Sequence, residues 1–193
     1  MMKLQQTVST KWLIVIELLI AIGFVIADNI FDLLPYSETP YILILILLSF
    51  ALHKTGLSSL GFKKPKSWIK TIAIGLIAGV GLQLFSSYIT EPFFAKLTGA
   101  EADTAQFNVL KGNTKFLLKY LVLAWTLAAF GEEIVFRGFF VNKFAALLGS
   151  TNKALWAGVI LSSVLFGIGH YYKGPAGMID STLSGLVFGS VYI

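Results

Sequence analysis

The sequence contains no cysteine and only two histidines, and just 13% of its 193 residues are charged. The absence of cysteine excludes disulfide bonds, thiolate metal sites and cysteine nucleophiles. The H-E-x-x-H pattern of zinc peptidases is also missing. Hydrophobic residues, in contrast, make up 56% of the chain, and the mean hydropathy is +0.78. This composition indicates an integral membrane protein, with residues 1–193 forming a single domain.

Apolar stretches separated by polar turns follow one another along the chain, and their lengths predict transmembrane helices. They cover residues 12–26 (extensible to 34), 41–52, 69–89, 115–148, 154–172 and 178–193. The predicted fold is all-α, a polytopic transmembrane helix bundle of about five spans plus a partial sixth. Residues 115–148 exceed the thickness of a bilayer, so this helix must tilt, break near Gly131 or Gly138, or project into the cytoplasm. Residues 90–114 are predicted to form an external loop, within which residues 93–97 are a candidate for a short interfacial helix.

Small residues and basic residues give further expectations about packing and orientation. Gly75, Gly79 and Gly81 are expected to let the third span approach a neighbour closely. Ten of the 15 Lys and Arg residues, including Lys63 in the basic loop 53–70, fall on the side shared with the N-terminus. This excess predicts a cytoplasmic N-terminus in the plasma membrane. The lysines lie in loops between apolar segments, so membrane lipid, and not nucleic acid, is the expected partner.

The stretch from Gly131 to Arg137 places three charges inside the longest apolar run. Charged side chains at membrane depth are costly and are usually partnered or functional. Glu133 and Arg137 are four residues apart with the acid first, which favours an ion pair on a helix. Glu132 lies about 100° around the helix from Glu133 and lacks that partner.

A geometric argument pairs Glu132 with His170. If residues 150–152 form the bend between two antiparallel helices, Glu132 and His170 lie equally far from it, at about 27 Å along each axis. A carboxylate beside an imidazole is a common general-base arrangement, in which the acid accepts a proton from water and the histidine orients that water. The spacing therefore identifies Glu132 and His170 as candidate catalytic residues.

Two other polar residues are expected to face water or headgroups. Glu17 lies within the first span, and we expect it to reach toward water at the cytoplasmic end, with a polar contact inside the bundle as the alternative. His53 lies at the edge of the basic loop and is expected to be solvated or at headgroup level.

Three alternatives to catalysis stay open from residue types alone. Glu132, Glu133, Arg137 and His170 could form a buried polar network that only holds two helices together. The same residues could bind zinc, although one histidine and two glutamates are a loose ligand set, and no cofactor is expected. A small transporter or channel is the third alternative, and it requires Glu17, Glu132 and His170 to line one polar path.

At these residues the sequence resembles the intramembrane proteases known as the CPBP family, which groups type II CAAX prenyl proteases with bacteriocin-processing (Abi) enzymes. Glu132, Glu133 and Arg137 match its Glu-Glu-x-x-x-Arg motif, and Phe166 and His170 match its Phe-x-x-x-His motif. The resemblance is best over residues 117–193, and the family-like core is taken as residues 115–193. It implies an all-helical membrane endopeptidase acting on peptide or protein substrates.

The resemblance also implies roles for individual residues. Glu132 would activate the attacking water, His170 would assist, and Glu133 with Arg137 would brace the site. A third family motif, His-x-x-x-Asn, is not matched, since no histidine follows His170. The chain ends within an apolar segment at Ile193, which is expected of a truncated protein. The resemblance is closest to the bacterial branch, associated with bacteriocin processing or self-immunity, and a non-catalytic immunity or peptide-binding scaffold protein is the alternative function.

Overall fold

The computed structural model describes residues 2–35, 37–62, 64–101 and 103–193, and every regular element within these ranges is helical. This confirms the all-α prediction. Lys63, which the orientation argument counted, lies outside the described residues. The α-helices are α1 (Met2–Asn29), α2 (Glu38–His53), α3 (Trp68–Phe85), α4 (Glu91–Thr98), α5 (Thr114–Leu123), α6 (Asn142–Leu147), α7 (Asn152–Ile168) and α8 (Gly174–Tyr192). Short 3-10 turns are η1 (Leu57–Leu60), η3 (Ala105–Leu110) and η6 (Tyr171–Lys173), and π-helical segments are η2 (Ser86–Thr90), η4 (Ala124–Gly131) and η5 (Glu133–Val141).

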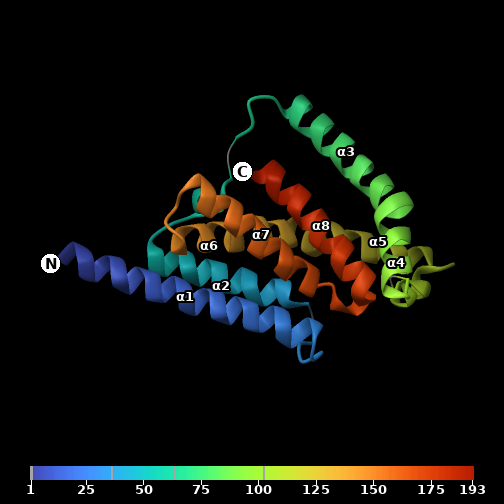
Figure 1. Ribbon diagram of the computed structural model, residues 1–193, viewed down its shortest axis with the longest axis horizontal. Helices are drawn as coiled ribbons and strands as arrows, with labels where there is room; N and C mark the ends of the chain where they lie inside the picture. The colour runs from blue at the N-terminus through green and yellow to red at the C-terminus, as the bar shows by residue number, and fades with distance from the viewer. Residues whose placement is uncertain (1, 36, 63, 102) are drawn as a thin grey trace.

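Helices α1 and α2 form an antiparallel pair that packs beside α6 and α7 (Figure 1). The rings of Phe24 and Tyr41 stack at 5.5 Å near the connecting turn. At the other end of the pair, Glu17 contacts His53. These two contacts fix the direction of α2 against α1. The buried side chains of Val25 and Ile42 join the pair to the hydrophobic core.

The helix that holds the acidic stretch runs without interruption from Thr114 to Leu147. It neither breaks at Gly131 nor at Gly138, the two sites considered in the sequence. Instead, it widens into the π-helical segments η4 and η5 on either side of Glu132. Such segments are rare and occur frequently at functional sites.

Helix α7 returns antiparallel to η5 and α6 at close range. The Ser162 hydroxyl donates to the Phe136 carbonyl at 2.6 Å. A Cβ atom at Gly158 would collide with the carbonyl of Val141, so the approach requires glycine at this position. The buried rings of Phe136, Phe139 and Phe140 fill the space that these helices share with α1 and α2.

After α7 the chain turns at Gly169 and His170 and continues into α8, with a bend of 58° between the two helical parts. Helix α8 packs along α7, and it also contacts α4. Gly185 and Gly189 lie against Ser163 and Val159 of α7, which lets the two backbones come close. The fifth predicted helix, residues 154–172, is therefore shorter than expected and ends at Ile168.

Helices α3, η2 and α4 form one helix from Trp68 to Thr98 that leans away from the rest of the molecule (Figure 1). None of the α3 side chains is buried. A Cβ atom at Gly75, Gly79 or Gly81 would meet nothing within 4 Å, so the predicted close packing at these glycines is wrong for the part of the chain that the structure describes. The external loop also begins later than residue 90, because α4 continues the helix to Thr98.

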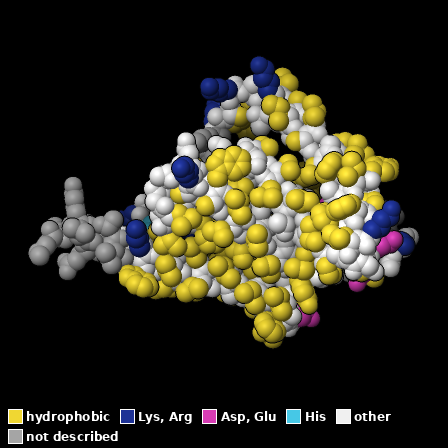
Figure 2. Space-filling model, in the orientation of Figure 1, with side chains coloured by type: hydrophobic (Ala, Val, Ile, Leu, Met, Phe, Trp, Pro, Cys, Tyr) yellow, Lys and Arg dark blue, Asp and Glu magenta, His cyan; other side chains and the backbone are white. Residues whose placement is uncertain are grey.

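Hydrophobic side chains cover most of the visible face, and basic and acidic side chains lie toward its edges (Figure 2). Within the described ranges, three helices are long and apolar enough to cross a membrane: Thr10–Asn29, Trp68–Thr98 and Thr114–Leu147. The bent pair α7 and α8 raises the number to four if it counts as one span. These helices indicate a membrane protein, but the predicted count of five spans and a partial sixth is not confirmed, since α2 has only 16 residues.

Candidate functional site

The ion pair predicted from the spacing of Glu133 and Arg137 is present. Arg137 Nη1 lies 3.3 Å from Glu133 Oε1, within the π-helical segment η5. The two partners differ sharply in environment, since the Arg137 side chain is 3% exposed and that of Glu133 is 48% exposed. The pair therefore joins a buried cation to a carboxylate at the surface of the helix bundle.

Arg137 is surrounded by aromatic rings. Its guanidinium carbon lies 4.5 Å from the centroid of the Phe166 ring and 5.3 Å from that of Phe188. Rings at this distance attract a cation through their quadrupole. Nη1 and Nη2 are nevertheless buried without a hydrogen-bond partner among the described residues, because the contact with Glu133 is close enough for an ion pair but lacks hydrogen-bond geometry. Aromatic packing, more than hydrogen bonding, holds this cation.

Glu132 is half-buried at the single residue that separates η4 from η5. Neighbouring charges act on its carboxylate: the cations of Arg137 and Lys173 attract it, and Glu133 repels it. In the described ranges, no hydrogen bond or ion pair joins Glu132 to His170. The carboxylate has oxygen atoms free to accept a proton or bind water.

The register of the helix pair differs from the predicted one by about one turn. Contacts between Val141 and Gly158 and between Phe136 and Ser162 place residue 132 opposite residues 166–167. The physical reason lies in the bend, which begins earlier than residue 150 because α6 already ends at Leu147. His170 therefore lies one turn beyond the level of Glu132, where α7 has ended and the chain bends.

His170 is held by the first residue of its own motif. Its Nδ1 lies 2.8 Å from the Phe166 carbonyl, and since a carbonyl can only accept, Nδ1 carries the hydrogen. In the neutral ring, Nε2 is then left with a free lone pair, as a proton acceptor requires. The imidazole also packs on the Phe166 ring, with centroids 4.6 Å apart.

A cavity of about 350 Å³ lies between α3, η2, α4 and α8 and has His170 in its wall. Its aromatic side is formed by Phe166 and Phe188, and its polar side is formed mainly by charged and hydroxyl side chains. These polar residues are Ser86, Glu91, Lys173, Asp180, Ser181 and Ser184. The cavity is large enough, and mixed enough in polarity, to hold a short peptide segment beside His170.

Three charged residues near the site were not selected from the sequence. Lys173 acts on both Glu132 and His170, Glu38 is buried at the start of α2 and acts on Glu132, and Asp180 lies in the cavity wall. Asp180 accepts hydrogen bonds from Ser86 at 2.8 Å and from Thr90. The sequence did offer one signal for it, since Asp180 is the single acidic residue in the segment 178–193, which was interpreted as apolar. The pairing of α8 with η2 could not be inferred without the fold.

A second polar cluster lies away from this site and overturns two expectations. Glu17 does not reach toward water, because its side chain is 2% exposed and accepts a hydrogen bond from Lys143 Nζ at 2.6 Å. His53 is not solvated, since its Nε2 lies 3.1 Å from both oxygens of Glu17. Glu17 therefore makes a polar contact inside the bundle. Its cluster is separate from Glu132 and His170, which counts against the transporter alternative.

No group of three or more histidine and acidic side chains that could hold a metal ion occurs within the described parts of the chain.

Comparison with known proteins gives one family match. Residues 114–193 match the model of a family described as type II CAAX prenyl endopeptidase Rce1-like. This range begins with α5 and includes Glu132, Glu133, Arg137, Phe166 and His170. No curated protein and no solved structure matches the chain.

Proposed function

We propose that this chain, whose residues 114–193 match the model of the Rce1-like family of type II CAAX prenyl endopeptidases, hydrolyses peptide bonds at the membrane through water activated by Glu132 and His170. The family makes a CAAX-protease-like membrane endopeptidase the general activity. The assignment of the individual residues rests on the arrangement described above and is the proposal.

The observation that supports it best is the double role of Phe166. Its ring packs against the Arg137 guanidinium, and its carbonyl accepts the hydrogen bond that orients His170. One residue thus joins the helix of the two glutamates to the histidine. This arrangement leaves the Nε2 lone pair of His170 and the carboxylate of Glu132 unoccupied by protein partners in the described chain.

In the proposed reaction, a water molecule bridges Glu132 and His170. Glu132 accepts one proton from this water, and the resulting hydroxide attacks the carbonyl carbon of the scissile peptide bond. His170 accepts a hydrogen bond from the water through Nε2 and orients it. Glu132 then passes the proton to the leaving amine as the carbon–nitrogen bond breaks, which yields a free carboxylate and a free amine.

Arg137 and Glu133 have a supporting role in this proposal. Arg137 is held between two rings and helps to fix the distance between η5 and the end of α7. Lys173 contributes positive charge close to both Glu132 and His170. A positive charge at this position would stabilise the negative charge that develops on the carbonyl oxygen in the transition state.

The finer proposal concerns the substrate. The mixed aromatic and polar wall of the cavity beside His170 suits a peptide segment that lies at a membrane surface. We propose bacteriocin precursors or peptides linked to self-immunity as the substrates to test, in a bacterial plasma membrane, together with a prenylated CAAX peptide. The motif resemblance supports this choice.

The test replaces Glu132 with Gln and His170 with Ala and measures peptide cleavage by the purified protein. General acid–base catalysis contributes about 10²–10⁴ in rate, so each variant should lose activity on that scale. Glu101→Gln, the same substitution in an exposed loop, is the matched control and should keep wild-type activity. Full activity in both site variants would exclude the proposed mechanism.

A second candidate function is a non-catalytic immunity or peptide-binding protein. The lack of a direct bond between Glu132 and His170 in the described chain, beside a cavity of about 350 Å³, is the observation that favours it. This function predicts that protection from a bacteriocin survives Glu132→Gln. Protection lost in Glu132→Gln, while the folded protein is still present in the membrane, would rule it out.

A further inference from the structure

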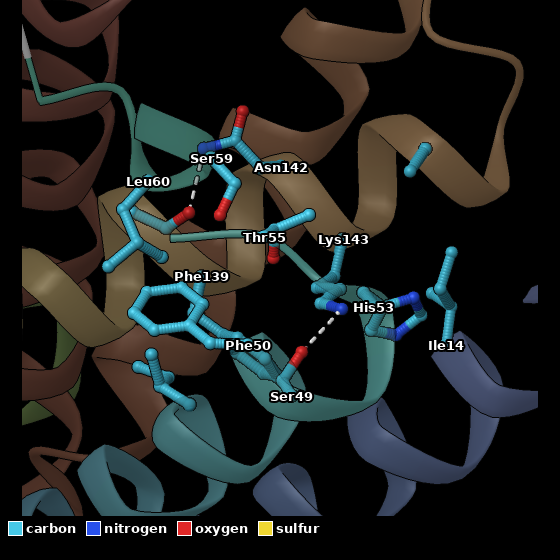
Figure 3. Close-up of a pocket in the computed structure, with 13 residues that line it drawn as sticks. Ile14, Ser49, Phe50, His53, Thr55, Ser59, Leu60, Phe139, Asn142 and Lys143 are labelled. Atoms are coloured by element: carbon cyan, nitrogen blue, oxygen red, sulfur yellow. Dashed lines mark hydrogen bonds between the residues drawn. The ribbon is translucent and has the colours of Figure 1, made fainter. Parts of the chain in front are cut away.

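A second cavity, of about 230 Å³, lies at the end of α2, on the side of η5 and α6 away from the proposed protease site. Its wall combines polar side chains from three elements with an apolar surface. Figure 3 shows Phe50 and Phe139 on one side of the space and Lys143 and His53 on the other. Neither Glu132 nor His170 lines this cavity, so the proposed protease function does not account for it.

The buried acid of this region is already neutralised. Glu17 lies behind the cavity wall and accepts hydrogen bonds from Lys143 and His53. Lys143 also donates to the Ser49 hydroxyl at 2.9 Å. An ammonium group has three N–H donors, so one remains after Lys143 has donated to Glu17 and Ser49. Lys143 can therefore donate to a ligand without giving up either partner.

The rest of the polar wall adds one further donor. Thr55 contributes a hydroxyl group, whereas the Ser59 hydroxyl already donates to the Gly56 carbonyl. His53 donates through Nε2 to Glu17, so in the neutral ring its second nitrogen is an acceptor. Lys54 follows directly at the end of α2 and is exposed, which adds positive charge at the mouth. The remaining Lys143 N–H, the Thr55 hydroxyl and the exposed Lys54 supply donors and positive charge, and the charge of Glu17 is already paired with Lys143, so the cavity favours an anion.

The opposite wall is apolar, with Ile14, Ile46, Phe50, Leu60 and Phe139. A cavity with one polar and one apolar wall suits a ligand that carries an anionic group on an apolar chain. A volume of about 230 Å³ is below the ~300–1,000 Å³ of pockets that enclose whole drug-sized ligands. The cavity is therefore sized for a headgroup and not for an entire lipid.

We propose that this cavity binds a phosphate group with net negative charge, held by Lys143 and Thr55. Basic pockets between membrane helices commonly bind anionic lipid headgroups. The phosphate belongs either to an anionic phospholipid whose acyl chains lie along the apolar wall or to a small soluble phosphate. Both sources present the same chemistry to Lys143, and the experiment separates them.

The experiment uses the full chain purified in detergent. Native mass spectrometry measures retention of phosphatidylglycerol against phosphatidylcholine, and thermal unfolding measures protection by sodium phosphate against sodium chloride at equal ionic strength. Glu17→Gln combined with Lys143→Gln removes the charge pair without leaving one partner alone. Ala146→Phe fills the cavity and leaves every charge in place, and Ala51→Phe on the exposed side of α2 is the matched control.

We expect the wild-type protein to retain phosphatidylglycerol about tenfold better than phosphatidylcholine, and both cavity variants to lose this preference, as removal of a hydrogen bond to a charged group predicts. Ala51→Phe should behave as wild type. Protection by sodium phosphate without lipid preference, lost in the same variants, would identify a soluble phosphate as the ligand. Equal retention of the two lipids with no phosphate protection, or binding unchanged in Ala146→Phe, would overturn the proposal. If the charge-free double variant does not fold, Ala146→Phe decides.

Discussion

The Arg137 guanidinium lies 4.5 Å from the centre of the Phe166 ring, and this contact joins the two sequence motifs in space. Arg137 comes from η5 in the widened helix, and Phe166 comes from the last turn of α7. The ring of Phe166 also packs on His170 and, edge-on, on Phe136 at 5.0 Å. A change at Phe166 should therefore affect the orientation of His170 as well as the environment of Arg137.

Phe166→Leu tests this connection. Leucine keeps an apolar side chain but removes the ring that contacts Arg137 and His170, while the backbone carbonyl that accepts from His170 stays in place. We expect kcat for peptide cleavage to fall by about tenfold, roughly the loss of one cation–π contact of 1–2 kcal/mol, with KM little changed. Phe94→Leu, on the outlying helix α4, is the control. A rise in KM with kcat unchanged would contradict a positioning role.

The charge pair Glu133 and Arg137 should respond asymmetrically to substitution. Glu133→Gln leaves the buried Arg137 cation without its carboxylate, whereas Arg137→Met leaves only a carboxylate that is 48% exposed. An unpaired buried charge is strongly destabilising, and replacing a buried ion by an apolar side chain is often neutral. We expect Glu133→Gln to lower the thermal midpoint in detergent more than Arg137→Met does.

The double variant Glu133→Gln with Arg137→Met should melt close to Arg137→Met alone, because neither protein keeps the buried Arg137 cation. If Arg137→Met were the less stable single variant, hydrogen bonding rather than aromatic packing would have to hold the guanidinium. Peptide cleavage is measured on the same samples, so that effects on stability and on activity can be separated. If Arg137 positions the catalytic residues, Arg137→Met should reduce activity even where stability is unchanged.

Two glycines on helix surfaces should give opposite results with alanine. Gly158→Ala places a methyl group against the Val141 carbonyl, and the helix pair must separate to accept it. Overpacking of this kind costs about 1–3 kcal/mol. Gly79→Ala meets open space, so it should be neutral or stabilise by about 0.5–1 kcal/mol through helix propensity. Thermal melting in detergent compares the two, and equal effects would contradict the observed packing.

Asp180 fastens the outlying helix to α8, so Asp180→Asn should loosen it. The carboxylate accepts from Ser86 and Thr90, and an amide cannot accept both bonds with the same strength. We expect faster hydrogen exchange over residues 86–98 by roughly tenfold, the effect of about 1–2 kcal/mol of local stability. Asp103→Asn, where the acid accepts only a local bond from the Ala105 N–H, is the matched control. Unchanged exchange in Asp180→Asn would show that apolar contacts alone hold α4.

The parts of the fold that depend on local spacing could be predicted from the sequence. The ion pair of Glu133 and Arg137 needs only a helix and a separation of four residues, and the antiparallel pair needs only a turn near Gly149. The register of that pair could not be predicted to within one turn, because it depends on where the helix stops. Gly149 and Ser150 adopt positive φ of 109° and 55°, which ends α6 before the expected bend.

Contacts between helices that are far apart in the sequence could not be predicted either. Glu17 and Lys143 are 126 residues apart, and nothing in either local sequence shows that their faces meet. The preference for a water-facing Glu17 followed from the cost of a buried carboxylate, and that cost disappears once Lys143 and His53 lie beside it. Asp180 could not be recognised for the same reason, since its hydroxyl partners come from η2.

The two π-helical segments around Glu132 have a consequence for its direction. Each residue advances an α-helix by about 100°, so a hydrogen-bond register that shifts by one residue rotates everything beyond it through a similar angle. Glu132 lies where two such registers meet. The direction of its carboxylate therefore depends on the hydrogen-bond registers of both π-helical segments. The π-helical segments thus set the direction in which the proposed base faces.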